Sequence, residues 1–493
     1  MKKFSAVLSA LFSAALAVAA QTNADLTPVC AMSLQDCVQE ALAHNLGLQI
    51  DRIAPQISLY NLNVYYGAYD PTFNFSGQHS RNESGPEGAP VSVSDGNTFT
   101  SGLNGTAPWG MTYGLNGNVS KTANSGSATN MFESSSGSVQ LQVTQPLLKN
   151  FWIDNNRLTI RVAKNALKQS EQVLRGQIIT TVTSVENAYY ELIYAQDNVA
   201  VQQEALDLAQ TQLDQDKQRV QIGTLAQLSV QSDESQVASS RASLISAQNN
   251  LAIDQNNLKT LLTDAYAETH GTNIQPTATL EAPLQLFDLQ ESWDKGMTER
   301  PDLLQQRLEV EHQGIALKYY LNQLFPELDL TGTLGYNGAA SDFNGTFDQL
   351  NDADRPTYGY GASISVPLSN VGPRNQYKIA KASVQAAVLT LKQLEQKIMV
   401  DIDTDVKQAQ SDYESVEATR EARIYAEAAL DAEQKTYAVG KATTFEVLQY
   451  QSALTTARGA EIRALANYEE ALATLAADEG STLERNGIDI EAK

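Results

Sequence analysis

The chain has 493 residues, of which 57 are acidic and 34 basic, and its formal net charge is −23. This acidic excess excludes nucleic acid as a main partner, because a nucleic-acid binder carries clustered Lys and Arg against the phosphates. Apolar residues make up 42% of the chain, which excludes disorder as the overall state. The length alone suggests about three domains of roughly 150 residues.

The N-terminus predicts export. Lys2 and Lys3 precede an apolar run that ends in small residues, so we interpret residues 1–24 as a secretory signal peptide, cleaved after Ala20 or Ala24. No later stretch of 18 apolar residues occurs, so a membrane crossing by the rest of the chain would require β-strands.

Cysteine and histidine are scarce. In an oxidising periplasm Cys30 and Cys37 are candidates for a disulfide, and two free thiols are the alternative. The two cysteines and four histidines show no metal-ligand spacing, and no Gly-x-Ser-x-Gly elbow or phosphate-binding glycine loop is present. We therefore expect no metal, no cofactor and no enzymatic activity.

The chain repeats itself. Residues 33–38 match residues 288–293 at an offset of 255, and near the end of the repeat Gly223 falls on Gly440 at an offset of 217. The change of offset indicates that the first copy is longer, with an insertion within 81–138 that is rich in Gly, Ser, Asn and Thr. The predicted organisation is a first repeat over 25–287, a second over 288–480 and a tail over 481–493.

Each repeat contains a very long helix. Residues 156–222 contain no proline and would reach roughly 100 Å as a helix. A seven-residue seam predicts a coiled coil with the following helix, after a turn at Gly223. The seam consists of Ile178, Val185, Leu192, Val199, Leu206, Leu213 and Val220. In the second repeat Gly440 stands where a long helix must reverse.

Short segments between the helices alternate apolar with small or polar residues, as membrane strands do. They are residues 72–80, 139–144, 328–336 and 358–366. Four strands do not close a barrel, since the smallest need about eight, so several chains must share one. Residues 98–106 and 111–119 alternate as well and predict an extra hairpin, but the pattern leaves open whether it joins the barrel.

These features resemble the TolC-like outer-membrane efflux family. The resemblance covers about residues 33–480 and includes Arg300-Pro301-Asp302-Leu303 and the turn at Val439-Gly440. It implies a mixed α and β fold in which three chains share a twelve-stranded outer-membrane β-barrel that continues into a long periplasmic α-helical barrel. It also implies a periplasmic adaptor and an inner-membrane transporter as partners, besides the lipid of the outer membrane.

The resemblance also supplies candidates for a periplasmic gate. Tyr437 matches a tyrosine of the family's closing network. Glu446 matches the first of two positions that can carry constricting carboxylates, and Gln449 occupies the second. Ser229 takes the place of Glu446 in the first repeat, so the closing network must differ there. The alternative for Glu446 is an ordinary exposed carboxylate.

We therefore expect a passive, gated exit duct for small molecules. A duct for type I protein secretion would look alike. A periplasmic coiled-coil adaptor or scaffold is the alternative of a different class, and it would explain the heptads but not the alternating strands.

Overall fold

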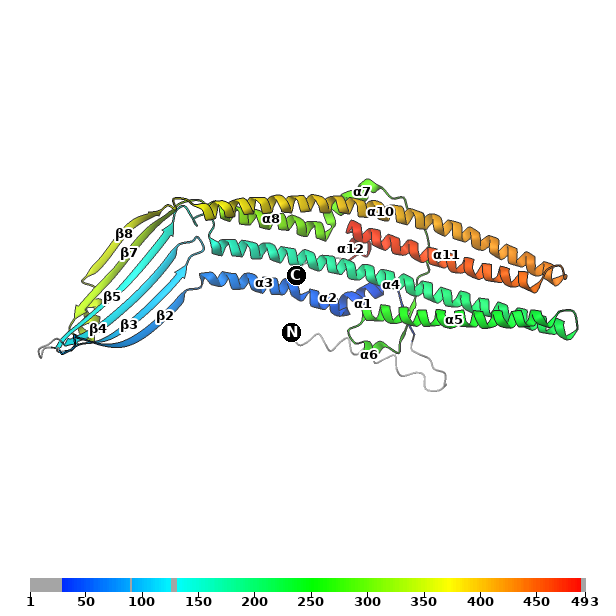
Figure 1. Cartoon of the computed structure of the whole chain (residues 1–493), viewed down its shortest axis with the longest axis horizontal. Helices are drawn as coiled ribbons and strands as arrows, with labels where there is room; N and C mark the ends of the chain where they lie inside the picture. The colour runs from blue at the N-terminus through cyan, green and yellow to red at the C-terminus, as the bar shows by residue number, and fades with distance from the viewer. Residues whose placement is uncertain (1–28, 89–90, 126–130, 489–493) are drawn as a thin grey trace. The chain divides into compact units, whose positions relative to one another are not determined.

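The computed structural model of the protein describes residues 29–88, 91–125 and 131–488 (Figure 1). The predicted signal peptide lies outside these residues. Along the chain the elements are β1 (Val29–Met32), α1 (Leu34–His44), α2 (Leu46–Asp51), α3 (Ile53–Tyr66), the 3₁₀ turn η1 (Gly67–Tyr69), β2 (Thr72–Ser84), β3 (Ser92–Thr106), β4 (Thr112–Ser125), β5 (Met131–Pro146), α4 (Asn155–Gln221), α5 (Gln227–Leu262), α6 (Tyr266–Thr269), β6 (Asn273–Pro276), α7 (Leu289–Glu299), α8 (Pro301–Asn322), β7 (Glu327–Ala340), α9 (Phe343–Asp352), β8 (Pro356–Ser365), α10 (Val371–Ala438), α11 (Thr444–Glu479) and α12 (Thr482–Arg485).

The chain divides into two compact units. The hairpin unit consists of residues up to 46, 181–285 and 408–473, and the sheet unit of residues 47–180, 286–407 and 474 onward. No helix in the described part of the chain is both long and apolar enough to cross a membrane. We describe each unit in turn.

The hairpin unit contains residues 181–221 of α4 and 408–438 of α10, the parts of the two long helices that precede their reversal. The predicted long helix is confirmed as α4, which has 67 residues, and α10 has 68. The predicted seam is also confirmed: Val185 and Leu192 are fully buried, and Leu258 is fully buried on α5. Burial of one apolar stripe per helix stabilises helices of this length, whose isolated helical propensity is modest.

A short parallel pair of strands, β1 and β6, also belongs to the hairpin unit. Tyr189 on α4 holds the ends of this pair. Its buried hydroxyl donates to the carbonyl of Met32, 3.1 Å away, and accepts from the amides of Thr277 and Ala278. All lone pairs and the proton of this phenol are therefore used.

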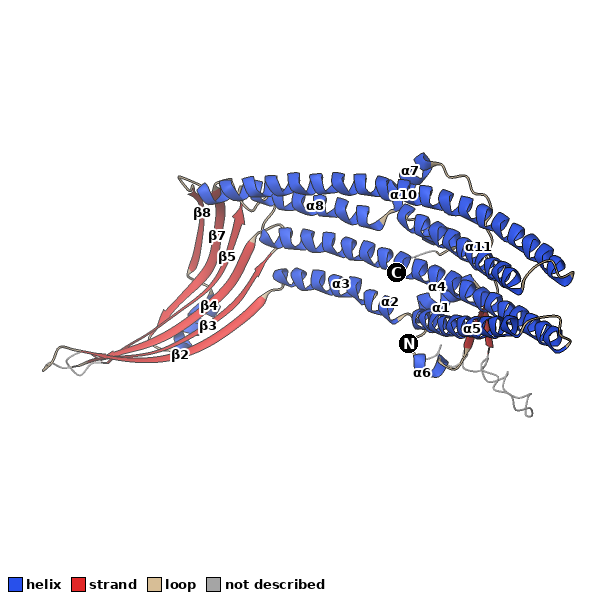
Figure 2. Ribbon diagram, turned by 45° about the vertical axis from the view of Figure 1, so that its right-hand side comes forward, coloured by secondary structure: helices blue, strands red, loops and turns tan. Residues whose placement is uncertain are grey.

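The sheet unit contains one six-stranded antiparallel sheet in the order β2-β3-β4-β5-β7-β8 (Figure 2). All four predicted strands are present. The possible extra hairpin is β3 and β4, and it lies between β2 and β5, so it joins the four predicted strands in one sheet. The physical reason is that both hairpin strands pair along their whole described length, which satisfies their backbone groups.

The register gives the sheet two different faces. One row of paired residues crosses all six strands as Phe73, Leu103, Leu115, Leu141, Leu334 and Tyr358. The adjacent row, on the opposite face, is Asn74, Gly102, Asn116, Gln140, Gly335 and Thr357. We call the first row the apolar row and the face that carries it the apolar face. The opposite face is the polar face. Every member of the apolar row is exposed, from 38% for Leu103 to 77% for Tyr358.

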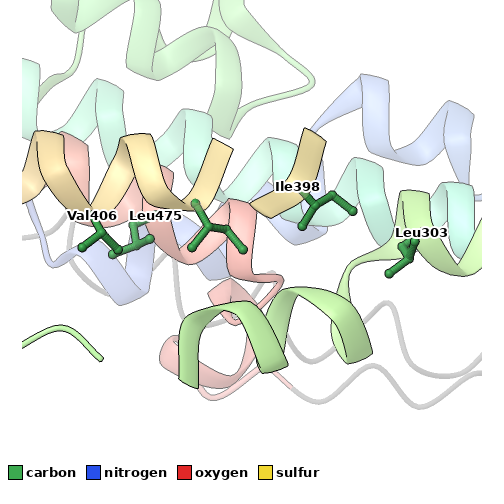
Figure 3. Close-up of a cluster of buried hydrophobic side chains, with 5 residues drawn as sticks. Leu303, Ile398, Val406 and Leu475 are labelled. Atoms are coloured by element: carbon green, nitrogen blue, oxygen red, sulfur yellow. The ribbon is translucent and has the colours of Figure 1, made fainter. Parts of the chain in front are cut away.

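The apolar core of the sheet unit lies where α7, α8, α10 and α11 meet. It contains Leu303, Ile398, Ile402, Val406 and Leu475 (Figure 3). Gly296 on α7 permits the close approach, because a Cβ there would lie 2.6 Å from Cδ1 of Ile402.

The motif Arg300-Pro301-Asp302-Leu303 sets the start of α8. Pro301 takes the first helical position, where its missing N–H costs nothing. The Arg300 guanidinium lies 3.0 Å from Asp302 and 3.1 Å from Asp478 at the end of α11, and Leu303 is fully buried. The motif therefore joins α8 to α11.

We expect Ile402→Ala to lower the free energy of unfolding by roughly 2–5 kcal/mol, because the substitution removes buried atoms and leaves a cavity. Thermal unfolding of the purified protein, followed by circular dichroism, would measure the change. Lys407→Ala on the same helix is the control, since it removes only an exposed i,i+4 ion pair with Asp403. Equal effects of the two substitutions would contradict the assigned core.

Candidate functional site at the helical hairpin tips

Two glycines end the long helices of the hairpin unit. Gly223 has φ +79° and Gly440 has φ +77°, the left-handed conformation that glycine adopts without strain. The amide of Thr224 donates to the carbonyl of Arg219, and that of Lys441 donates to the carbonyl of Thr436. These are Schellman ends. Each turn reverses the chain into the next helix.

Tyr437, one turn before Gly440, contacts the other hairpin. Its ring is buried, and its hydroxyl lies 2.6 and 2.7 Å from the two carboxylate oxygens of Asp216 on α4. Thr444 on α11 completes the group, with its Oγ1 2.9 Å from the tyrosine oxygen and 3.0 Å from Asp216 Oδ2. Burial, and then the hydrogen bond to Asp216, raise the pKa of Tyr437, so the phenol remains a donor.

Asp216 is fully buried and has further partners on its own helix. Gln212 donates to it through Nε2 at 3.1 Å. The Arg219 guanidinium lies 3.6 Å from Asp216 and 4.3 Å from the centre of the Tyr437 ring, where it attracts both the carboxylate and the ring face. The buried carboxylate of Asp216 is therefore hydrogen-bonded by Gln212 and paired with Arg219, as the burial of a charge requires.

Asp233 on α5 is the second fully buried acid of this cluster. Neither of its carboxylate oxygens accepts a hydrogen bond from a donor in the described part of the chain. Burial, and then the charge of Asp216, raise the pKa of Asp233 to about 7. Two ionised carboxylates cannot bond to each other, so a proton on Asp233 turns it into the donor to Asp216.

The two acids occupy core positions of the heptad. Asp216 lies three residues after Leu213 of the seam, and Asp233 three residues after Val230. The same second core position holds small buried residues at Ala209 on α4 and at Ser240 and Ala247 on α5. An acid at a heptad core position can be recognised in the sequence as a candidate buried charge, but Asp216 and Asp233 are not among the predicted site residues.

Glu446 lies apart from this cluster. Thr443 and Glu446 form a capping box at the start of α11: the amide of Thr443 donates to Glu446 Oε2 at 2.7 Å, and the amide of Glu446 donates to Thr443 Oγ1 at 3.3 Å. The hydrogen bonds from the backbone and then the side chain of Thr443 lower the pKa of Glu446, which is fully exposed. Gln449 is exposed and Ser229 is half-buried, and neither belongs to the cluster.

The two cysteines are free thiols in the structure, so the expected disulfide is not formed in it. Cys30 is exposed on β1 and Cys37 is buried on α1. Burial raises the pKa of Cys37 to about 12, which keeps this thiol protonated and slow to react. No group of three or more His, Cys, Asp or Glu residues in the described ranges could hold a metal ion.

The Asp216 and Asp233 pair should make the tips sensitive to pH. Because the pKa of Asp233 is raised from 3.8 to about 7, its proton stabilises the fold fully below pH 3.8, and this contribution is lost as the pH rises through about 7. We expect hydrogen exchange in α5 near residue 233 to show local stability higher at pH 5 than at pH 8, by on the order of 1 kcal/mol or more.

Asp233→Asn should abolish this difference, because an amide is neutral at both pH values and can donate to Asp216. Glu234→Gln is the control, since Glu234 is exposed and forms only a 3.5 Å ion pair with Lys217. A pH dependence that survives in Asp233→Asn would contradict the shared proton.

Comparison with known proteins agrees with this architecture. The model of the family described as "Outer membrane efflux protein" matches residues 110–263 and 295–480, which is more than half of the chain. "Outer membrane protein TolC" of Escherichia coli is 25% identical over 295 residues, 59% of each chain, so the match spans less than two thirds of TolC. "Outer membrane efflux protein BepC" of Brucella suis is 22% identical over 66% of this chain and 68% of its own length.

Solved structures share the fold at lower identity. The CmeC outer membrane channel of Campylobacter jejuni has a TM-score of 0.66 at 15% identity and covers 93% of this chain and 90% of its own. CusC, whose structures describe transmembrane channel formation, has a TM-score of 0.69 at 16% identity, with 94% and 95% covered. The chain belongs to the outer membrane efflux protein family.

Proposed function

We propose that the protein is the outer-membrane exit duct of a tripartite efflux system, formed by three copies and passive in its action. The observation that carries the proposal is the six-stranded sheet with one exposed apolar face and one polar face, in a chain of this family. Strands that alternate in this way have lipid on one side and water on the other. The helices of the hairpin unit then extend into the periplasm.

The described strands support a wider barrel than the resemblance implied. Six strands from each of three copies make eighteen rather than twelve. Within the described part of the chain, the edge strands β2 and β8 have one unpaired side each, and pairing between copies would satisfy these groups in lipid. Barrels of about this strand number leave an aqueous channel.

The family and its relative BepC are described as outer membrane efflux proteins. We propose that the duct carries small molecules, with an inner-membrane transporter supplying the energy and a periplasmic adaptor joining the two. A soluble adaptor of the periplasm would leave the apolar row from Phe73 to Tyr358 in contact with water. Such a large exposed patch disfavours the adaptor alternative. Type I protein secretion would use the same duct and differ in its substrate.

Two experiments test the duct. Fractionation of cells should recover the full-length protein in the outer membrane, and the purified trimer should conduct ions in a planar bilayer. Loss of the gene should sensitise cells to small toxic compounds, whereas loss of a secreted protein alone would indicate type I secretion. Recovery in the soluble periplasm would exclude the duct.

We further propose that the cluster of Tyr437, Asp216 and Thr444 helps to hold the periplasmic end closed, because it joins one hairpin to the other. We expect Tyr437→Phe to raise the open probability and mean conductance of the trimer. The substitution removes the donor to a buried carboxylate, a loss of roughly 1–3 kcal/mol. Tyr425→Phe on the same helix is the control, since Tyr425 is 70% exposed. Unchanged conductance of Tyr437→Phe would contradict this role.

Glu446 is proposed to contribute to ion selectivity. Three copies around a narrow axis would place three carboxylates in one ring, which attracts cations. We expect Glu446→Gln to lower the cation preference measured by reversal potentials in a salt gradient. Glutamine keeps the capping box, so the helix start should stay intact.

The control for this measurement is Glu421→Gln, which removes one acid from the exposed surface of α10. An unchanged cation preference in Glu446→Gln would leave Glu446 with the capping role alone.

A further inference from the structure

The helix α9 lies between β7 and β8 in sequence and folds back onto the apolar face of the sheet, against β4, β5 and β7 (Figure 2). Its seat is a pair of glycines that face each other across β5 and β7, Gly137 and Gly338. A Cβ at Gly137 would lie 2.9 Å from Thr346 Cγ2, and one at Gly338 would lie 2.6 Å from the carbonyl oxygen of Thr346. Only glycine at both positions lets the helix approach this closely.

Specific contacts fix the helix on this seat. Thr346 is fully buried and donates its hydroxyl to Ser135 Oγ on β5 at 2.8 Å. Gln349 accepts from the amide of Ala339, and Asp342 caps the first turn by accepting from the amide of Gly345. The rings of Phe343 and Phe99 lie 5.9 Å apart. These contacts hold α9 in a defined position on the sheet.

The register shows where α9 lies along the strands. Along β5 from Leu141 toward Glu133, the apolar row is followed first by a row that includes Phe75 and Val139. The next row on this face, which we call the seat row, includes Phe99, Val119 and Gly137. Beyond the seat row the same face carries ion pairs: Lys121 with Glu133 at 2.9 Å, and His79 with Asp95 at 3.7 Å. α9 thus occupies the boundary between an apolar zone and a charged zone, where amphipathic helices bind at a membrane interface.

A mainly apolar cleft of about 630 Å³ opens between α9 and the sheet, and its polar lining residues, among them Ser101 on β3 and Asn351 on α9, are uncharged. Phe75, Phe99 and Val139 contribute from the strands, and Phe347 and Leu350 contribute from the helix. No ionisable side chain lines the cleft. Phe347 is 55% exposed at its margin.

The mainly apolar lining of the cleft favours a hydrocarbon chain as its occupant. A hydrocarbon chain needs no hydrogen bonds, whereas a peptide would bury unsatisfied amides there. A second copy of the chain would be expected at the sheet edges β2 and β8, but α9 packs against strands in the interior of the sheet order. The remaining neighbour of this face is lipid.

We propose that α9 is an interfacial helix that holds one acyl chain of an outer-membrane lipid in the cleft between Phe347, Leu350 and the sheet. This inference rests on the proposed function, because it requires the apolar face to lie in the membrane. It adds a lipid-binding site that the duct itself does not need.

The test uses the full-length trimer in vesicles of phosphatidylethanolamine, phosphatidylglycerol and lipopolysaccharide. The photoreactive amino acid benzoylphenylalanine replaces Val139, which lines the cleft, or Leu334, which belongs to the open apolar row. Irradiation in vesicles should attach lipid at both positions. After exchange into detergent, the adduct at position 139 should exceed that at position 334 severalfold, as measured by mass spectrometry.

A filling variant provides the second arm. Ser101→Phe adds a ring to the cleft wall and should remove the detergent-resistant adduct at position 139 while the vesicle adduct at 334 persists. Equal loss of both adducts on detergent exchange, or a cross-link from position 139 to another protein chain, would overturn the acyl-chain site. Absence of lipid adducts at both positions in vesicles would instead reject the membrane location and with it the proposed function.

Discussion

The structure depends on one constraint: a β-strand in a place without water must pair all of its backbone hydrogen-bonding groups. Inside the sheet of six strands this requirement is met by continuous antiparallel registers, but β2 and β8 each have one side without a partner strand among the described residues. The exposed apolar row adds a second demand, because its removal from water requires lipid. The first demand requires further copies of the chain and the second requires the membrane. Under the proposed function, assembly and membrane insertion are therefore linked steps of folding.

In the hairpin unit the difficulty is to bury charge. The seams between the helices are apolar, but near the tips they contain buried acids. Asp216 is paired with Tyr437, Thr444, Gln212 and Arg219, whereas Asp233 depends on a shared proton. Replacing such groups with apolar residues often stabilises a protein. Their presence at core positions therefore favours a role in joining the hairpins reversibly over a role in maximal stability. The same cluster connects α4, α5, α10 and α11, so a change at one acid reaches both hairpins.

Much of the fold was predictable, because periodicity is a local property of the sequence. The heptad from Ile178 to Val220 and the alternation of the strands gave the helices and strands, and Gly223 and Gly440 gave the turns. Whether the hairpin of β3 and β4 joins the sheet depends on long-range register, which alternation does not encode. Tyr437 was selected by resemblance, but its partner Asp216 was not. Asp216 becomes a candidate only when the second core position of the heptad is followed as well as the seam, and the seam alone was used for prediction. Glu446 shows the converse: its capping box with Thr443 was readable as Thr-x-x-Glu.

In the proposed duct, the polar face has a consequence for the passage of solutes. From Thr331 outward along β7, and on the matching positions of the neighbouring strands, Asn, Gln, Ser, Thr and Gly predominate and no ionisable side chain is present among the described residues. Such a wall exchanges hydrogen bonds with a solute about as readily as water does, and it has no fixed charge to trap one. Passage requires binding weak enough to allow release. The wall would thus give low friction and little discrimination, and selection among solutes would fall to the components that load the duct.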